Sequence, residues 1–402
     1  MNHITVNLKR TNHTLTLNIQ QDPQTIVCYH SNCLDGFMAA YVLFRLHNST
    51  DDVIYLPITY DNKLPFKPEE HQGADVVFVD FCPTEQQVLD LVRSMSLNSI
   101  TIFDHHATRF EDANKIATEL FQKPSGFTKV DIHFDLDKSG ARLVYDKQNF
   151  PSASIFAKEL ITLVVLAERY DLWKHDGEPE CDESYLAAYF SNCINKTLRE
   201  KIKAANSMGY EDRLKACTQA FKEKAEILET IEFSDILIMG RGFIATDLND
   251  IRQLPVERTS VMLSNRPDGL VETSIASGAC PGRHVNMFST VVKRQFNDCA
   301  VVLTHEERNV EGEVKSWKYS LRQGAVRLMD MHKLAKAIEP DGGGHPDAAG
   351  FVSSMSPGTV VFHIENVLQQ SHLPDGELNQ WMNRLATSRR TQEACDCAEK
   401  AL

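Results

Sequence analysis

Short apolar runs alternate with longer amphipathic stretches over residues 25–175. The apolar runs predict strands at 25–28, 53–56, 76–79 and 99–103. Apolar residues recur at helical spacing at 37–47, 84–96, 139–147 and 154–169. Strands that alternate with helices are typical of a parallel sheet with helices on both faces. The expected fold class is therefore α/β.

The pattern changes after about residue 195. Residues 196–232 are rich in Lys and Glu and have helical spacing, so they predict a helical linker. Short strands are expected again at 235–239, 260–263, 271–275, 300–303 and 318–322, with a helix at 329–338. The sequence therefore predicts one α/β domain at 23–195 and a second, smaller α/β domain at 233–370.

The two ends of the chain differ from both domains. Residues 1–22 alternate apolar and polar positions around a polar break at 9–12, which predicts a β-hairpin. We expect this extension to join the edge of a sheet, with a contact between two copies in a homodimer as the alternative. Residues 371–402 are polar with little periodicity and predict a weakly packed C-terminal tail.

Length and charge narrow the classes of function. A chain of 402 residues is too long for one ordinary core, which agrees with two domains. The formal net charge is −13, whereas proteins that bind long nucleic acids usually carry a basic stripe. The composition therefore disfavours a long nucleic acid as partner and leaves small phosphate esters, held by a few local cations.

Apolar segments and cysteines indicate the compartment. No apolar stretch approaches the roughly 18 residues of a membrane span, and the first ten residues have no apolar signal core. The ten cysteines form no CxxC pair, so they are expected to be reduced core residues. We expect a cytoplasmic protein without a membrane partner.

Three strands of the first domain are followed by similar polar residues. A single Asp after a strand is usually a helix cap or a turn residue, but three strands with this pattern favour a site. The carboxyl ends of parallel strands meet at one edge of a sheet, where ligands bind. The residues expected there are His30, Asn32, Asp35, Asp80, Asp104, His105 and His106.

Carboxylates and imidazoles without thiolates suit Mn²⁺ better than a structural zinc site, with Mg²⁺ or Co²⁺ as alternatives. Two such ions about 3.5–4 Å apart can clamp a phosphoryl group. Asp80 follows a central strand and is expected to bridge them. His105 and His106 point to different sides of an extended backbone, so one can bind metal while the other meets substrate.

Five motifs, taken in order, resemble a known family. Asp104-His105-His106 resembles the namesake motif of the DHH phosphoesterases. The stretch YHSNCLDGF at 29–37 is similar to their first motif, Asp80 to the second, and Asp171 to the fourth. GGGHPDAAGF at 342–351 resembles the signature of the associated C-terminal DHHA1 domain. The similarity spans about residues 25–365.

The resemblance implies a DHH catalytic domain and a DHHA1 substrate-binding domain with the active site in the cleft between them. It implies that His106 faces the scissile phosphate and that Asp104 orients the histidines. The implied metal ligands are His30, Asp35, Asp80, His105 and Asp171. The implied phosphate-binding residues are Arg322, Gly343, Gly344 and His345. Consecutive glycines let backbone N–H groups approach an anion. Arg283 is a further candidate, with a solvated loop as the alternative.

The first motif departs from the family pattern. Asn32 stands where a second carboxylate is expected, and it would bind a metal through its neutral carbonyl, directly or through water. Cys33 is an alternative soft ligand, which would admit zinc.

The resemblance also narrows the substrate. The DHHA1-like signature argues against the pyrophosphatase branch, and the acidic charge argues against long DNA. Cyclic-dinucleotide enzymes often carry membrane or sensory segments, which are not seen in this sequence. The expected activity is hydrolysis of short linear oligoribonucleotides or dinucleotides such as pGpG to nucleoside monophosphates. The alternatives are a cyclic-dinucleotide or cyclic AMP phosphodiesterase, a polyphosphate hydrolase and a catalytically weak nucleotide-binding sensor.

Overall fold

The chain forms two compact units, Met1–Ile244 and Ala245–Leu402, and each is described by itself. The computed structural model describes residues 3–7, 24–31, 33–46, 53–60, 63–94, 96–122, 128–148, 155–174, 179, 181–266, 269–281, 284–308, 316–344, 346–371, 373 and 377. Residues 196–232, expected to link the domains, fall within the first unit.

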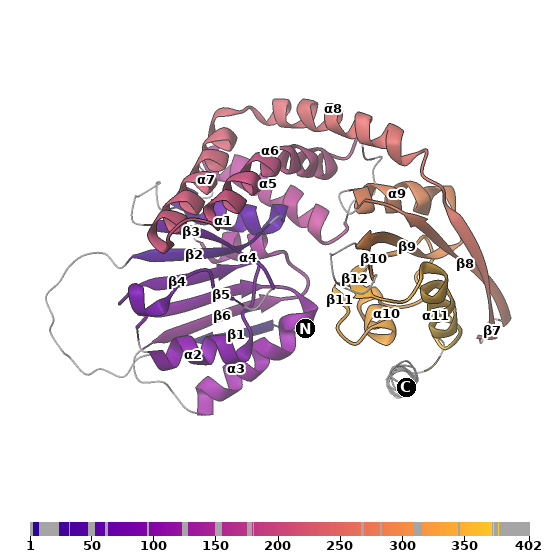
Figure 1. Ribbon diagram of the computed structural model, residues 1–402, viewed down its shortest axis with the longest axis horizontal. Helices are drawn as coiled ribbons and strands as arrows, with labels where there is room; N and C mark the ends of the chain where they lie inside the picture. The colour runs from indigo at the N-terminus through magenta and orange to yellow at the C-terminus, as the bar shows by residue number, and fades with distance from the viewer. Residues whose placement is uncertain are drawn as a thin grey trace, which may run out of the picture. The chain divides into compact units, whose positions relative to one another are not determined.

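A six-stranded sheet forms the centre of the first unit, in the order β1-β6-β5-β4-β2-β3 (Figure 1). Its strands are β1 (His3–Asn7), β2 (Thr25–His30), β3 (Val53–Ile58), β4 (Asp75–Val79), β5 (Ser99–Asp104) and β6 (Lys129–Asp135). Strands β2 to β6 pair in parallel, which confirms the expected parallel sheet. Strand β1 pairs antiparallel with β6 and so extends the sheet edge. The second strand of the expected N-terminal hairpin lies outside the described residues.

Helices cover both faces of this sheet (Figure 1). Alternate residues of β2 point to opposite faces: Ile26 and Cys28 join one apolar core, and Val27 and Tyr29 join the other. Burial on both sides explains why the strands appear as continuous apolar runs. The first core includes α2 (Glu85–Ser94) and α3 (Phe110–Gln122); the second includes α1 (Leu34–Leu46), α4 (Gly140–Lys147) and α5 (Ile155–Asp171).

The order of the strands places a switch point next to β2. Strand β3 lies on one side of β2 and β4 lies on the other, so the chain changes direction across the sheet here. In open parallel sheets, ligands bind in the crevice beyond the carboxyl ends of the strands at such a point. His30 ends β2 and Asp80 follows β4, so both lie at this crevice.

Three long helices follow, namely α6 (Glu183–Ala205), α7 (Tyr210–Thr230) and α8 (Phe233–Ile251). The end of α6 and all of α7 form the helical region expected at 196–232. The strand expected at 235–239 is wrong, because these residues belong to α8. Ile244, Leu248 and Ile251 are buried at helical spacing. The five-residue window that suggested a strand was too short to show this period.

The second unit contains a mixed sheet in the order β11-β12-β10-β9-β8-β7. Strands β8 and β9 pair in parallel, and the other neighbours are antiparallel. The two-domain α/β architecture is therefore confirmed, with mixed pairing in the second sheet. The strands are β7 (Glu257–Arg266), β8 (Gly269–Ala279), β9 (Cys299–Arg308), β10 (Ser316–Gln323), β11 (Gly343–Gly344) and β12 (Ala348–Ser353).

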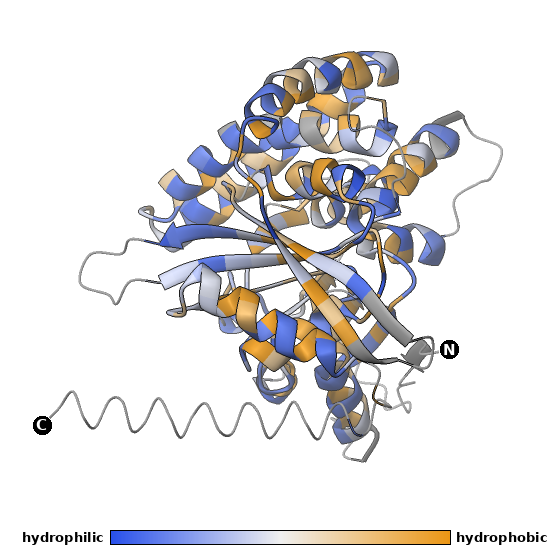
Figure 2. Cartoon of the chain, turned by 90° about the vertical axis from the view of Figure 1, so that its right-hand side faces the viewer, coloured by the Kyte–Doolittle hydropathy of each residue, from blue (hydrophilic) through white to orange (hydrophobic). Residues whose placement is uncertain are grey.

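Helices α9 (Val285–Gln295), α10 (Met331–Ile338) and α11 (Pro357–Gln369) complete the second unit. Buried residues of α10 and α11 share one apolar core with the second sheet. Hydrophobic and hydrophilic residues share the same helices, as Figure 2 shows by colour. None of the helices formed by the described residues combines the length and apolarity needed to cross a membrane.

Candidate metal centre

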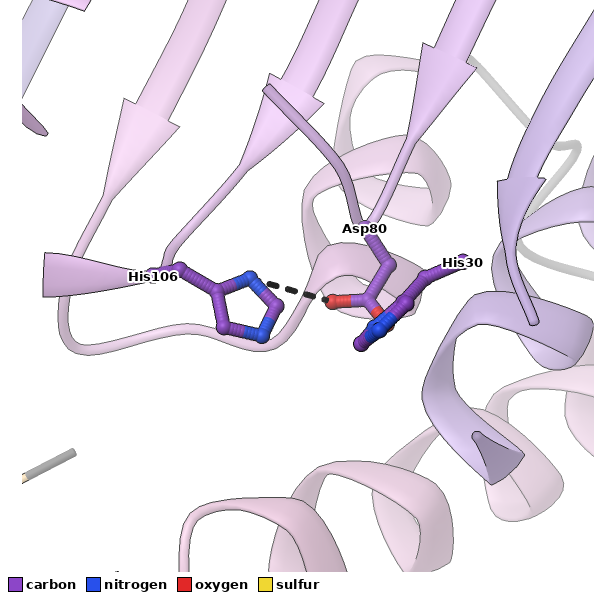
Figure 3. A group of neighbouring side chains, drawn as sticks. All are labelled: His30, Asp80 and His106. Atoms are coloured by element: carbon purple, nitrogen blue, oxygen red, sulfur yellow. Dashed lines mark hydrogen bonds and ion pairs between the residues drawn. The ribbon is translucent and has the colours of Figure 1, made fainter. Parts of the chain in front are cut away.

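Six side chains at the carboxyl edge of the first sheet form two groups that could each hold a metal ion. The ligand atoms within each group lie within 4.8 Å of one another. We call the group His30, Asp80 and His106 the two-histidine triad, shown in Figure 3. We call the group Asp35, His105 and Asp171 the two-aspartate triad.

The carboxylate of Asp80 lies between the two imidazoles of the two-histidine triad (Figure 3). Its Oδ2 is 3.2 Å from Nδ1 of His30, and its Oδ1 is 3.8 Å from Nδ1 of His106. The three residues come from the ends of β2, β4 and β5. The parallel sheet therefore brings together residues that are far apart in the sequence.

His105 connects the two triads. Its Nε2 lies 3.8 Å from Oδ2 of Asp35 and 3.3 Å from Oδ2 of Asp171 within its own triad. The same nitrogen lies 3.1 Å from Oδ1 of Asp80 in the other triad. Asp35 is in the first turn of α1 and Asp171 is the last residue of α5. The two groups are thus one continuous cluster of carboxylates and imidazoles.

The start of α4 supports both triads. Gly140 and Ala141 donate their backbone N–H groups to the carboxylate of Asp35, at 2.6 and 3.1 Å. Free N–H groups at a helix N-terminus favour a negative charge there. A Cβ atom on Gly140 would lie 2.7 Å from Cβ of Asp80, so any larger residue would force the Asp80 turn to shift. Our sequence reasoning missed this support, although Ser139 before an apolar helix is a recognisable N-cap.

The backbone of Asp80 adopts an unusual conformation. Its φ is +54°, in the left-handed region that residues other than glycine rarely adopt. Asp is among the residues that tolerate this region best. Such conformations cost roughly 1–3 kcal/mol and cluster at functional sites. The sharp turn after β4 brings this carboxylate between His30 and His105.

Asp104 holds the two histidines that follow it. Its Oδ1 is 2.7 Å from Nδ1 of His106 and accepts the backbone N–H of His105 at 2.8 Å. A proton held on Nδ1 of His106 leaves Nε2 of that ring to meet a metal ion or a substrate. Oδ2 of Asp104 is buried with no hydrogen-bond partner among the described residues.

Burial and neighbouring charges shift the pKa values of the carboxylates in opposite directions. Burial raises the pKa of Asp35 and that of Asp171, and the charge of Asp80 adds to both shifts. Burial would also raise the pKa of Asp80, but hydrogen bonds from His105 and His30 hold it well below its usual range. A negative charge on Asp35 or Asp171 is therefore harder to keep than one on Asp80 when no metal is bound.

The pKa of His105 is also set by the opposing effects of burial and of nearby charges. Burial alone would lower it, but the hydrogen bond to Asp80 and the charge of Asp171 raise it to about 10. A positive charge on His105 supplies part of the charge that a bound cation would bring to the three carboxylates.

The donor set fits divalent metal ions. The triads offer carboxylate oxygens and imidazole nitrogens, which suit Mn²⁺ and related ions but do not identify one. Oδ2 of Asp171 is buried and makes no hydrogen bond among the described residues. Cys33 belongs to neither triad. Its Sγ lies 3.9 Å from Oδ1 of Asp171, and burial raises the pKa of the thiol, which disfavours a thiolate ligand.

The structure brings together most of the site residues expected in the first domain. Among the residues that the sequence nominated as metal ligands, Asn32 lies outside the described residues. His106, which we expected at the substrate, lies in the two-histidine triad. The other nominated ligands all belong to the triads, namely His30, Asp35, Asp80, His105 and Asp171.

Tyr60, an aromatic residue beside the cluster, was missed by our sequence reasoning. Its ring stacks on Phe81 with centroids 4.6 Å apart and meets the edge of His30 at 5.2 Å. The guanidinium of Arg109 lies 4.9 Å from the centre of the Tyr60 ring. Tyr60 follows β3, so inspecting that strand end as well would have found it.

In the second unit, the expected phosphate-binding residues Arg322, Gly343 and Gly344 lie on β10 and β11, the two strands that flank β12. Arg322 on β10 pairs with Ala348 of β12, and Gly344 of β11 pairs with Ala349. Arg322 donates from Nη2 to Oδ1 of Asn286 at 2.8 Å. The N–H of Gly344 donates to Nδ1 of His332 at 3.3 Å. Gly343 precedes Gly344 in β11, whereas His345 and Arg283 lie outside the described residues.

No protein-family model matches the chain, and no curated protein matches it. The structure itself shows two connected His/Asp triads that could hold metal ions. They lie at one edge of the first sheet, next to its switch point.

Proposed function

We propose that this chain is a metal-dependent phosphodiesterase of the DHH type. Its substrates would be short linear oligoribonucleotides or dinucleotides such as pGpG, cleaved to nucleoside monophosphates. The observation that carries this proposal is the contact between the triads: Asp80 lies 3.2 Å from His30 and 3.1 Å from His105. A carboxylate that reaches both triads could contact two neighbouring ions at once. Two ions this close together can clamp a phosphoryl group.

Two divalent ions, with Mn²⁺ as our first choice, would neutralise phosphate oxygens and lower the pKa of an attacking water. The exposure of each histidine side chain indicates its role. The His105 side chain is 0% exposed and can only support the centre, whereas that of His106 is 17% exposed and can reach a substrate. We assign the proton for the leaving oxygen to His106 in the state in which its Nε2 carries a proton and binds no ion, with Asp104 orienting the ring.

The second unit would hold the substrate through its phosphates. Arg322 supplies a permanent cation, and the glycines of β11 lie two strands away in the same sheet. We propose Arg322, Gly343, Gly344, His345 and Arg283 as the residues that meet the nucleotide. The net charge of −13 supports a short substrate, because a long nucleic acid would meet repulsion over most of the surface.

One experiment tests the activity against its alternatives. The purified chain is incubated with Mn²⁺ and, separately, pGpG, ApA, cyclic di-GMP, cyclic AMP and tripolyphosphate. The controls are Asp80→Ala, His105→Ala and the surface variant Asp90→Asn at an exposed position of α2. We expect turnover of the linear dinucleotides by wild type and Asp90→Asn, and none by the triad variants.

The other outcomes separate the alternatives. Cleavage of cyclic substrates alone would replace the linear activity with the cyclic one. Turnover of tripolyphosphate alone would indicate a polyphosphate hydrolase. Tight nucleotide binding without turnover of any substrate would leave a sensor.

A further inference from the structure

A cavity of about 360 Å³ lies in the first unit beside the metal centre. Tyr29 of β2, the end of β3, one face of α6 and the start of α7 line it. Residues 31 and 33, on either side of Asn32, also face it. Its volume is within the range of small-molecule sites. We call it the basic cavity, after its four cationic lining residues Lys63, Arg199, Lys203 and Arg213.

The charge of this cavity is opposite to that of the chain. Four Lys or Arg side chains line it, and the described residues around it include no Asp or Glu. A second cavity of about 420 Å³ near α5 is mixed, with two cations and three glutamates. In a chain with a net charge of −13, a cavity whose charged lining residues are all cations indicates an anionic ligand.

The cations of α6 reach the cavity because they share one helix face. Asn195, Arg199 and Lys203 follow one another at intervals of four residues, so they form a single stripe. Lys196 and Lys201 belong to the same helix but do not line the cavity. The basic lining is therefore a property of one face and not of the whole helix.

A buried lysine fixes the orientation of Asn195 in the cavity wall. Lys224 is 2% exposed and donates from Nζ to Oδ1 of Asn195 at 2.6 Å and to Oγ of Ser191 at 3.1 Å. The amide oxygen of Asn195 faces Lys224, and an ammonium group at that position can only donate, which favours this orientation. The N–H₂ group of Asn195 is then the part available to the cavity. A donor at this position suits a phosphate oxygen.

Much of the remaining wall is apolar. Leu56, Ile58, Leu64 and Leu198 line the cavity, together with Tyr29 and a few uncharged polar residues such as Thr59 and Asn206. An inorganic anion alone would not need this surface, whereas the sugar and base of a nucleotide would cover it. The combined lining matches a phosphorylated nucleoside.

Cys33 connects this cavity to the metal centre. Cys33 lines it, and its Sγ lies 3.9 Å from Oδ1 of Asp171 in the two-aspartate triad. We propose that the basic cavity is a second substrate subsite, which binds the phosphate and nucleoside of the unit adjacent to the bond being cleaved. Its role as a substrate subsite rests on the proposed function, whereas its ability to bind a nucleotide does not.

Binding is measured first, without added metal and with a chelator present. The probe is 5′-AMP, with adenosine and inorganic phosphate as partial ligands, titrated by calorimetry. The double variant Arg199→Gln/Lys203→Gln is compared with Lys196→Gln/Lys201→Gln, which removes the same charge from the same helix outside the cavity. We expect the first pair to weaken AMP binding at least tenfold and the second less than twofold. Equal affinities in the two double variants would overturn the proposal.

Asn195→Asp provides a second variant that keeps the fold. The new carboxylate retains a partner for Lys224 but removes the N–H₂ donor, so AMP binding should fall at least tenfold while the melting temperature is maintained. Unchanged AMP binding would contradict the role of this amide.

Turnover of pGpG with Mn²⁺ then separates the two proposals. We expect Arg199→Gln/Lys203→Gln to raise KM at least tenfold with kcat within twofold. If the wild-type protein binds AMP but shows no turnover, and the double variant loses AMP binding, the enzyme proposal fails and a nucleotide-binding site remains. If turnover is normal and both double variants behave alike, the subsite fails and the enzyme proposal stands.

Discussion

The two triads use the same donor types at the same sheet edge, yet their charges are balanced differently. In the two-histidine triad, two imidazoles face the single carboxylate of Asp80, whose pKa is held low. In the two-aspartate triad, Asp35 and Asp171 share His105, and the pKa of each carboxylate is raised by burial and by like charge. The two imidazoles therefore offset the negative charge of the two-histidine triad, whereas the two-aspartate triad would gain more from a bound divalent cation.

Exposure separates the two triads in the same direction. In the two-histidine triad, His30 and His106 are 22% and 17% exposed and Asp80 is 1% exposed, whereas in the two-aspartate triad Asp35 and His105 are fully buried and only Asp171, at 20%, is partly exposed. The buried triad is suited to anchoring an ion permanently. The more open triad is suited to an ion that also meets substrate. The difference predicts unequal metal affinities within one centre.

Asp80→Asn is expected to have the largest effect, because Asp80 contacts both triads. The loss of a shared negative charge should lower kcat/KM about 10³-fold, which corresponds to several kcal/mol of transition-state stabilisation. The measurements are kcat/KM on pGpG with Mn²⁺ and the metal content by mass spectrometry. Retention of both ions together with a tenth of the activity would remove Asp80 from its bridging role.

Asp35→Asn and His30→Gln test the predicted difference in affinity between the triads. Each variant should bind one ion where wild type binds two. In a Mn²⁺ titration by calorimetry, Asp35→Asn should lose the tighter phase, with an affinity loss of about 10²-fold. His30→Gln should lose the weaker phase. The reverse assignment of phases would contradict the comparison drawn from the pKa shifts.

Metal removal should change stability through the two-aspartate triad. Mn²⁺ at a hundred times its Kd stabilises a folded protein by about 2.7 kcal/mol, a rise in Tm of about 5–10 °C for a unit of this size. Asp171→Asn should lose most of this gain. Without metal, the same variant should melt above wild type, because it removes a carboxylate that is unfavourable when charged. Calorimetric scans with and without a chelator test both statements, and an Asp171→Asn protein that melts below wild type without metal would refute the second.

Gly140→Ala should have the smallest effect, although it touches both triads. The added Cβ would lie 2.7 Å from Cβ of Asp80 and 3.0 Å from Oδ2 of Asp35. Overpacking of this kind costs about 1–3 kcal/mol. The matched control is Gly242→Ala in α8, where an added Cβ meets nothing within 4 Å and should stabilise by about 0.5–1 kcal/mol. Urea unfolding compares the two, and equal changes would show that the contact with Asp80 relaxes without cost.

The parts of the centre that follow buried strands could be predicted from the sequence. His30, Asp80 and His105 follow runs such as Val76–Val79, which are apolar on both faces and so are easily recognised. Asp171 ends a helix, and no strand pattern marks it, so it was found only through the family resemblance. Strand β6 was missed because polar residues such as Lys129 and Asp131 interrupt its apolar positions.

Contacts between distant residues could not be predicted in the same way. The hydrogen bond from Gly140 to Asp35 joins residues that are 105 positions apart, and no local pattern encodes such a pair. Lys224 appears in the sequence as one of many lysines on an amphipathic helix, and only packing shows that it is buried against Asn195. The strand assigned to 235–239 failed because its window was shorter than two helical turns.

Metal bound to these triads should protect the first unit against proteases, because the ligands come from segments far apart along the chain. The triads draw residues from His30 to Asp171, including the ends of three strands and of α5. An ion bound there would act as a cross-link that holds these segments together, because none could open locally without losing a ligand. Added Mn²⁺ should therefore slow cleavage throughout this stretch, whereas cleavage beyond Ala245 should be unaffected.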